Sequence, residues 1–399
     1  MRNSGRSPGR GAAGQLKWSV DTGSESAGFQ VILGPDGTIY HTTYGTQTTP
    51  GKLVARNPSD GSVRWTFTAF SQTISTIPAV GQNGLIYFAD SLRLYAVDLQ
   101  TGVQRWVTIA TTGSPDWRSP TIGTDGTDGT VYFPGAGGTQ AFDGATGAQR
   151  TNFAPATNGV TGMPQTTPAM GPDGELYVGG GQGGLYSIDR SGCTRWSKAV
   201  GHVGGTAMGD DLALYATVHP VVNTNIPPTQ VIAFDRLNGN IKWTTNDVPG
   251  HDTPPAIGPD GTVYVLGALG ELTALDPATG AVKWSFDGPG ANRASPAIGA
   301  DGTIYILSGS ILGSDLLAID PATGVQKWAY RLPSSPESIP TNATPTIATD
   351  GTIYVATFGF QAGKVFAIKA TAPACFACSP ASLRKPRRRI QPLRKPWIF

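Results

Sequence analysis

The segment Ala-Leu-Asp-Pro-Ala-Thr-Gly-Ala-Val-Lys-Trp, residues Ala274–Trp284, decides the fold because it recurs along the chain. Ala318–Trp328 and Ala96–Trp106 repeat its pattern of an alanine, an aspartate two residues later, a Thr-Gly pair and a basic residue before a tryptophan. A missing member falls at Thr151, and with it included successive closing positions lie 41 to 47 residues apart. The closing tryptophans are Trp18, Trp65, Trp106, Trp196, Trp243, Trp284 and Trp328. A period of this size predicts a repeat architecture in which each unit stacks on its neighbours, with the tryptophans as structural residues between them.

A second signal, of the form Asp-Gly-x-apolar-Tyr, precedes the first in each unit. It separates two short runs, such as Pro296–Gly299 and Thr303–Leu307, which is the pattern of a β-hairpin. A third run ends at the repeated aspartate, the Thr-Gly turn reverses the chain, and a fourth run carries the tryptophan. The eight copies are Asp36–Tyr40, Asn83–Tyr87, Asp128–Tyr132, Asp173–Tyr177, Asp210–Tyr215, Asp260–Tyr264, Asp301–Tyr305 and Asp350–Tyr354. Four strands in about 44 residues predict one blade of a β-propeller.

The two ends of the repeat predict how the ring closes. The last unit, residues 346–370, lacks a tryptophan strand, whereas Gln15–Val20 carries Trp18 with no unit before it. We therefore predict an all-β, eight-bladed β-propeller of four-stranded antiparallel blades, closed by the N-terminal strand pairing into the last blade. Residues 1–14 are predicted to form an N-terminal extension, residues 15–370 the propeller, and residues 371–399 a basic, disordered tail whose prolines disfavour helix and strand.

Composition excludes several classes of protein. The chain of 399 residues holds 54 Gly and 32 Pro, which suits turns between strands, and it has no apolar run long enough for a transmembrane helix. Three cysteines cannot make a disulfide framework. Seven of the 29 Lys and Arg residues lie in residues 379–399 and three in the first ten, so the body of the chain is acidic. The overall pI of 8.4 therefore does not predict specific nucleic-acid binding.

The alternation of strand direction predicts two different faces. The Asp-Gly and Thr-Gly turns share a regular face, where the repeated aspartates cap the turns and are structural. The connections between blades and between second and third strands share the other face, here called the loop face, and we predict a binding site there around the central channel. Arg118 and Arg293 could pair with a carboxylate or phosphate and Trp117 could stack on a ring, unless the channel mouth is merely solvated, with Arg118 paired to Asp116. The predicted ligand-binding residues are Asp116, Trp117, Arg118, Gln165, His202, His251, Asp252, Asn292, Arg293 and Asn342.

All four histidines are predicted on the loop face: His41 after a second strand, His219 in a second-to-third loop, and His202 and His251 at entries to neighbouring blades. His202, His251 and Asp252 are the one trio that could converge on a metal ion, but their spacing matches no metal motif. We therefore predict no metal site.

Residues 15–370 resemble the PQQ-like, or quinoprotein-type, repeat family of WD40/YVTN-like propellers, whose tryptophan-docking motif matches Ala274–Trp284 and Ala318–Trp328. The family includes PQQ-dependent dehydrogenases and the propeller lipoprotein of the outer-membrane barrel-assembly machinery, which implies an extracytoplasmic protein whose export signal is absent from this chain. Quinoprotein dehydrogenases also carry an adjacent-cysteine disulfide, Ca²⁺-ligating side chains and long insertions. Here Cys193 is solitary and insertions are short. We expect no cofactor, with PQQ and Ca²⁺ as the alternative.

These observations favour a non-catalytic, monomeric propeller scaffold that binds a protein partner or a small ligand through the loop face. Val218–Gln230 and Tyr44–Lys52 are the longest departures from the repeat and would suit a protein partner. One alternative is an enzyme, either a PQQ-dependent oxidoreductase or another enzyme that uses the channel mouth. Another is a cell-surface structural or adhesive module.

Overall fold

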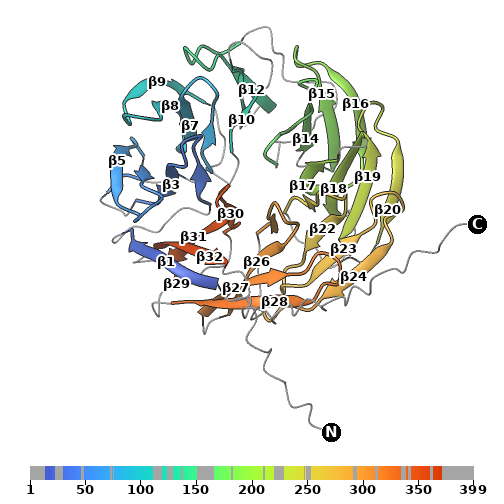
Figure 1. The fold of residues 1–399 in the computed structure, drawn as a ribbon. Coiled ribbons are helices and arrows are strands. Elements are labelled where there is room, and N and C mark those ends of the chain that lie inside the picture. Colours follow the sequence, from blue (N-terminus) through green and yellow to red (C-terminus); the bar gives the residue numbers. More distant parts are fainter. Residues whose placement is uncertain are drawn as a thin grey trace, which may run out of the picture.

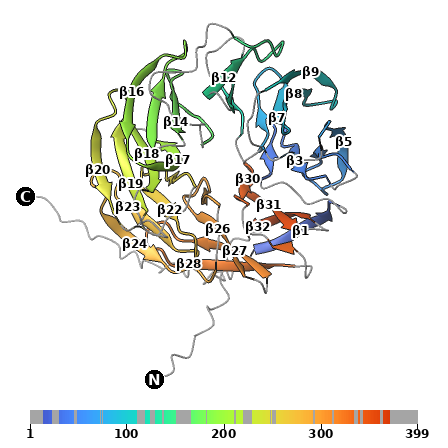
Figure 2. The same ribbon diagram turned by 180° about the vertical axis from the view of Figure 1, so that it is seen from behind.

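Eight β-sheets surround a central axis in the computed structural model (Figures 1 and 2). The model describes residues 14–22, 30–45, 49–71, 74, 76–110, 119–123, 129–135, 138–150, 166–180, 183–209, 212–219, 229–246, 248, 253–290, 294–310, 313–333, 338–339, 343–359 and 363–370. No helix occurs in these ranges. The prediction of an all-β, eight-bladed β-propeller is confirmed. Residues 371–399 lie outside the described ranges, so the predicted domain boundaries stay predictions.

Each blade is one antiparallel sheet, and in the first seven blades the strands follow chain order from the channel outward. The first four blades comprise β2 (Ile32–Leu33), β3 (Ile39–Thr43), β4 (Lys52–Arg56) and β5 (Val63–Thr68); β6 (Ala79–Val80), β7 (Leu85–Ala89), β8 (Arg93–Asp98) and β9 (Gln104–Ile109); β10 (Thr121–Ile122), β11 (Val131–Gly135) and β12 (Gly138–Phe142); and β13 (Ala169–Met170), β14 (Leu176–Gly180), β15 (Gly184–Ile188) and β16 (Thr194–Ala199). The third sheet has three named strands, and a single bridge joins Phe142 to Gln149 at its outer edge.

The remaining blades follow the same plan. They comprise β17 (His202–Met208), β18 (Ala213–His219), β19 (Gln230–Asp235) and β20 (Ile241–Thr245); β21 (Ala256–Ile257), β22 (Val263–Leu266), β23 (Leu272–Leu275) and β24 (Val282–Phe286); β25 (Ala297–Ile298), β26 (Ile304–Ser310), β27 (Gly313–Ile319) and β28 (Gln326–Leu332); and β30 (Thr346–Ile347), β31 (Thr352–Gly359), β32 (Lys364–Ala370) and β1 (Gly14–Asp21). One element was not predicted: the short strand β29 (Ser338–Ile339) also pairs with β31. It fits because β31 is long enough for β30 and β29 to pair with different parts of the same edge.

The N-terminal strand closes the ring as predicted. Strand β1 pairs antiparallel with β32, and Trp18 lies opposite Ala367 in the register. Figure 2 shows the blue β1 beside the red β32. The Lys364 ammonium lies 2.8 Å from the Asp21 carboxylate at the end of this pairing. Because β1 pairs along the outer edge of β32, it becomes the outer strand of the last blade and closes the ring within one chain.

Six of the repeated tryptophans join their blade to the next one. Trp65 Nε1 donates a hydrogen bond to the Leu99 carbonyl in the Thr-Gly turn of the following blade, at 3.1 Å. The turn glycine, Gly102, has φ of +70°, and a Cβ there would lie 2.6 Å from the Trp65 indole. Glycine is thus required both for the backbone conformation and for space. Five further indoles donate to the equivalent carbonyl, namely Trp18 to Pro58, Trp106 to Gly144, Trp196 to Arg236, Trp243 to Pro277 and Trp284 to Pro321.

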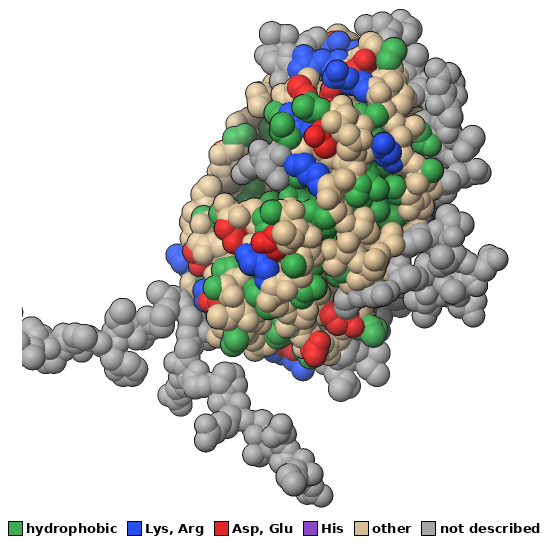
Figure 3. Space-filling model, turned by 90° about the vertical axis from the view of Figure 1, so that its right-hand side faces the viewer, with side chains coloured by type: hydrophobic (Ala, Val, Ile, Leu, Met, Phe, Trp, Pro, Cys, Tyr) green, Lys and Arg blue, Asp and Glu red, His purple; other side chains and the backbone are tan. Residues whose placement is uncertain are grey.

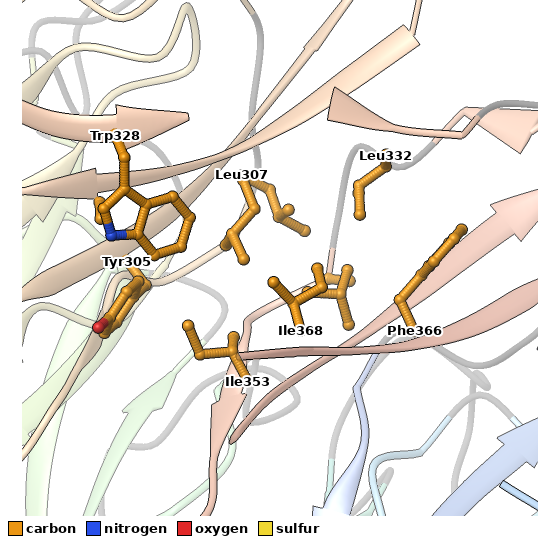
Figure 4. Close-up of a cluster of buried hydrophobic side chains, with 11 residues drawn as sticks. Tyr305, Leu307, Trp328, Leu332, Ile353, Phe366 and Ile368 are labelled. Atoms are coloured by element: carbon orange, nitrogen blue, oxygen red, sulfur yellow. The ribbon is translucent and has the colours of Figure 1, made fainter. Parts of the chain in front are cut away.

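The hydrophobic core is divided into clusters that lie between neighbouring blades. Figure 4 shows one of them, in which Tyr305, Leu307 and Trp328 of the seventh blade pack against Ile353 and Ile368 of the eighth. Alternate residues of each strand face opposite neighbours, and both sides of the second and third strands are buried, as in β3, β7 and β23. Each fully buried aliphatic or aromatic side chain contributes about 1.5–3 kcal/mol relative to exposure. The core therefore stabilises the ring through a series of separate apolar contacts between neighbouring blades, here called seams.

The repeated aspartates cap the Thr-Gly turns, as predicted. Asp98 Oδ1 accepts hydrogen bonds from the Gln100 and Thr101 amides at 3.0 and 2.9 Å. A hydrogen bond from Arg105, together with these amides, lowers the pKa of Asp98 to about 2. Asp276 and Asp320 make the same turn contacts. Figure 3 shows acidic and basic side chains interspersed on the rim that carries the outer strands. These carboxylates are structural, as the repeat pattern predicts.

Candidate functional site

Hydrogen bonds between turns confirm the predicted division into two faces. In the second blade the Leu99 amide, in the Thr-Gly turn, donates to the Gly84 carbonyl in the first turn at 3.0 Å. In the fifth blade the Arg236 amide contacts the Leu212 carbonyl in the same way, also at 3.0 Å. Both kinds of turn therefore lie on the regular face. The connections between blades and those between second and third strands lie on the loop face.

Among the ten predicted ligand-binding residues, His202 lies within the described ranges. The other nine fall outside them, and their roles stay predictions: Asp116, Trp117, Arg118, Gln165, His251, Asp252, Asn292, Arg293 and Asn342. The centres of the two long loops, residues 46–48 and 220–228, also lie outside the described ranges.

Five buried small residues, which sequence reasoning missed, lie at the start of the inner strands. Four of them directly follow a predicted ligand-binding residue. Each stands two residues before the proline that opens an inner strand. The hydroxyl of Thr76 accepts a hydrogen bond from the Ala89 amide at 2.9 Å, and that of Thr166 accepts one from Gly179 at 2.9 Å. In the second and fourth blades these bonds fix the start of the inner strand against the end of the second strand. We name these buried residues the entrance residues: Thr76, Thr166, Thr253, Ala294 and Ala343. A small residue at a constant distance from proline is the sequence signal that could have found them.

The fifth blade departs from the repeat at the channel. Its inner strand β17 has seven residues, whereas the inner strands of the other seven blades have two. The extra length places His202 directly opposite His219, the last residue of β18. The two half-buried imidazoles have ring centroids 5.9 Å apart. Thr229 Oγ1, just before β19, lies 3.4 Å from His219 Nδ1. His219 was expected in a loop, but the strand extends to include it.

The prediction for His41 is wrong. His41 lies inside strand β3, and its side chain is completely buried. Arg56 Nε donates a hydrogen bond to His41 Nε2 at 2.9 Å, and the same guanidinium donates to the Gly61 carbonyl at 2.9 Å. Burial, and then the Arg56 charge, lowers the pKa of His41 to about 3, so the imidazole is neutral. Strand β3 continues past its predicted end, and the His41 side chain therefore points into the hydrophobic core.

Three large apolar side chains are exposed together on the loop face of the first two blades. Phe70, Leu92 and Ile109 have exposed fractions of 78%, 62% and 74%. The Arg93 guanidinium carbon lies 3.8 Å from the Phe70 ring centroid, and Arg93 pairs across the strands with Ile109. We name these four residues the apolar loop patch. Its sequence signal is an apolar residue, Leu92, within a second-to-third connection.

A buried carboxylate holds the apolar loop patch in place. Asp90 Oδ1 accepts hydrogen bonds from the Leu92 and Arg93 amides at 2.9 and 2.7 Å. Asp90 Oδ2 accepts one from the Tyr95 hydroxyl at 2.6 Å. The turn that presents Leu92 is therefore fixed before any partner arrives, which limits the entropy lost on binding.

A shallow cavity of about 360 Å³ lies on the regular face of the fourth blade. Its charges are paired: Arg195 bonds to Glu175, and Arg236 lies 2.9 Å from Asp173. Its lining residues are Asp173, Glu175, Asp189, Arg190, Ser191 and Arg195. They continue the turn network of the regular face and give no argument for a ligand.

The described part of the channel entrance does not fit Ca²⁺ and PQQ. The entrance residues are threonines and alanines, which supply neither the carboxylates that Ca²⁺ prefers nor cations for an anionic quinone. Within the described ranges there is no group of three or more His, Cys, Asp or Glu side chains able to hold a metal ion. Cys193 is exposed in a turn of the regular face, away from the channel mouth, where its amide donates to Asp189. We derive no chemistry through this cofactor.

Solved structures with the same architecture belong to proteins of different functions. BamB from Moraxella catarrhalis is 18% identical, with a TM-score of 0.66 over 90% of this chain and 98% of that one. A europium-containing methanol dehydrogenase is 13% identical, with a TM-score of 0.63 over 89% and 93% of the two chains. The quinohemoprotein alcohol dehydrogenase of Comamonas testosteroni is 15% identical, with a TM-score of 0.66 over 90% and 77%. At these identities the likeness establishes the fold alone.

Sequence comparison assigns the family. No curated protein matches the chain in sequence. No helix in the described part of the chain is long and apolar enough to cross a membrane. The family model described as outer membrane protein assembly factor BamB matches residues 10–245 and 227–372, which together span the propeller. The chain therefore belongs to this family of PQQ-like β-propeller proteins.

Proposed function

We propose that this protein is a non-catalytic, extracytoplasmic scaffold that binds a protein partner through the apolar loop patch. The observation that carries the proposal is the exposure of Phe70, Leu92 and Ile109 around Arg93, which stacks on Phe70 and pairs across the strands with Ile109 on the face where the repeat varies. Apolar clusters of this kind mark interaction sites on soluble proteins. The family description as an assembly factor for outer membrane proteins supports both a protein partner and a location outside the cytoplasm.

The chemistry of the patch suits the centre of a protein interface. Aromatic residues and arginine are enriched at the positions that dominate binding energy. Burying each exposed apolar side chain against a partner would contribute about 1.5–3 kcal/mol. Arg93 already stacks on Phe70, and Asp90 fixes the turn, so few side-chain rotations remain to be lost. We propose that the protein acts as a monomer, since β1 completes the last blade from within the same chain and no second copy is needed to close the ring.

The test uses the full chain as bait in a crosslinked pulldown from the cell envelope of its source. Leu92→Asp and Ile109→Asp place charges in the patch and should abolish capture of the partner. Val325→Asp is the matched control, because Val325 is a similarly exposed apolar residue next to a Thr-Gly turn on the regular face of the seventh blade. It should capture normally. Thermal unfolding should be unchanged in all three variants. Recovery of the same partners by the patch variants and the wild type would contradict the proposal.

The non-catalytic part of the proposal has a separate test. Dye-linked dehydrogenase activity that appears on addition of PQQ and Ca²⁺ would support a PQQ-dependent oxidoreductase instead. We expect no such activity with primary alcohols or aldose sugars as substrates.

A further inference from the structure

We propose that His202 and His219 chelate a divalent transition-metal ion of the Zn²⁺, Ni²⁺ and Cu²⁺ class on the loop face of the fifth blade. The inference goes beyond the proposed scaffold function and does not depend on it. Its basis is the direct pairing of the two histidines across strands β17 and β18.

The distance between the rings suits a shared ion. Metal–nitrogen bonds of about 2.0–2.1 Å place two imidazole centroids roughly 5 Å apart around a tetrahedral ion. The observed centroid distance is 5.9 Å, and the ring planes differ by 32°. Small rotations of the two side chains bring the nitrogens onto one ion, while the hydrogen-bonded strands stay in place. Imidazole is a preferred ligand of Zn²⁺, Ni²⁺ and Cu²⁺, so the donor atoms define the class of ion.

A neighbouring hydroxyl orients one of the ligands. Thr229 is buried, and its Oγ1 lies 3.4 Å from His219 Nδ1. When His219 Nδ1–H donates to this oxygen, Nε2 is the ring nitrogen that carries the lone pair a metal ion would take. Metal-binding histidines usually donate their second nitrogen to such a partner, which fixes the tautomer. The Thr229 carbonyl accepts a hydrogen bond from the Val248 amide at 3.2 Å, so this partner is itself held by the blade.

Among the described residues, β17 is the one inner strand longer than two residues, and in the eighth blade the separate strand β29 pairs with the far end of β31. Within the described residues, the fifth blade is the one whose inner strand and second strand place two imidazoles opposite each other. The extension is packed tightly: Val203 fills the space beside Gly179, and Pro254 lies too close to Gly205 for any side chain there. A paired, immobilised hairpin end that carries two imidazoles is the kind of rigid support that a metal site needs.

The test measures binding of Zn²⁺, Ni²⁺ and Cu²⁺ ions to the full chain by calorimetry. Cys193, Cys375 and Cys378 are first replaced by serine, because thiols would bind the same ions. We expect one ion per chain. His202→Ala and His219→Ala should each weaken binding at least 10-fold. Gln230→Ala is the control, because it removes a polar side chain from the adjacent strand but no imidazole, and it should bind as the parent does.

Two further measurements separate loss of the ligand from loss of the fold. Metal-free thermal unfolding of both histidine variants should match that of the parent, and added Zn²⁺ should raise the melting temperature of the parent alone. Electron paramagnetic resonance of bound Cu²⁺ should show coupling to two imidazole nitrogens in the parent and to one in each variant. The proposal would be overturned if His202→Ala and His219→Ala both bound the ions as tightly as the parent does.

Discussion

Lowering the pH from 7 to 5 should destabilise the protein through the buried histidine His41. Burial, with the Arg56 charge as a second cause, lowers the pKa of His41 from 6.5 to about 3. Because the folded pKa is depressed, the neutral imidazole contributes its full stability above pH 6.5. That contribution is lost as the pH falls from 6.5 towards 3, since the unfolded chain binds the proton first. The linkage relation gives a loss of about 2 kcal/mol at pH 5 from this one group.

Urea unfolding followed by tryptophan fluorescence at both pH values measures the effect. His41→Gln keeps an oxygen that can accept the hydrogen bond from Arg56 but does not titrate, so its free energy of unfolding should fall about 2 kcal/mol less between pH 7 and 5. Tyr40→Phe is the control, because it removes a buried hydrogen bond from the same strand and no group that titrates in this range. It should keep the wild-type pH dependence. Equal losses in wild type and His41→Gln would refute the assignment of the acid sensitivity to this imidazole.

Three further substitutions test the seams and the patch. Gly102→Ala should lower the free energy of unfolding in urea by about 2–4 kcal/mol, because the new Cβ meets the Trp65 indole. Gly84→Ala, at a glycine with a similar φ but open space, should lower it by about 1 kcal/mol. Equal losses would contradict the inference that Trp65 packs against Gly102. Trp18→Ala should cost about 3–5 kcal/mol and lower the melting temperature, and a stability within 1 kcal/mol of wild type would exclude a closing role for β1. Asp90→Ala should weaken partner capture although Leu92 remains, and Asp90→Asn, which keeps an acceptor for the turn amides, should restore it; full capture by Asp90→Ala would exclude a positioning role.

The fold was predictable because its information is local and repeated. Each Asp-Gly and Thr-Gly turn has a specific backbone requirement, and each indole recurs at the same distance from them. The pairing of Trp18 with the last blade followed from counting strands at the two ends. Every one of these inferences uses residues within one repeat or the comparison of one repeat with the next.

The site was less predictable because it depends on departures from the repeat. His41 was misplaced because the end of a strand within a blade has no local signal, and a difference of a few residues turns a loop side chain into a core one. The pairing of His202 with His219 required knowing that β17 extends to seven residues. The patch around Phe70 required distances between residues in different strands and blades. None of these can be obtained from periodicity alone.

The closing strand has a consequence for how the molecule is made. Lys17 Nζ donates to Thr352 Oγ1 at 3.0 Å across 335 residues of chain. Among the propeller strands, β1 comes first along the chain, yet it can pair only after the final blade has been synthesised, and until then its indole is uncovered. Contacts between residues this far apart in sequence slow folding and leave an aggregation-prone intermediate with exposed hydrophobic surface. We expect the ring to open first at this pairing on heating, because it joins strands from opposite ends of the propeller, so a crosslink between β1 and β32 should slow unfolding more than one placed within any other blade.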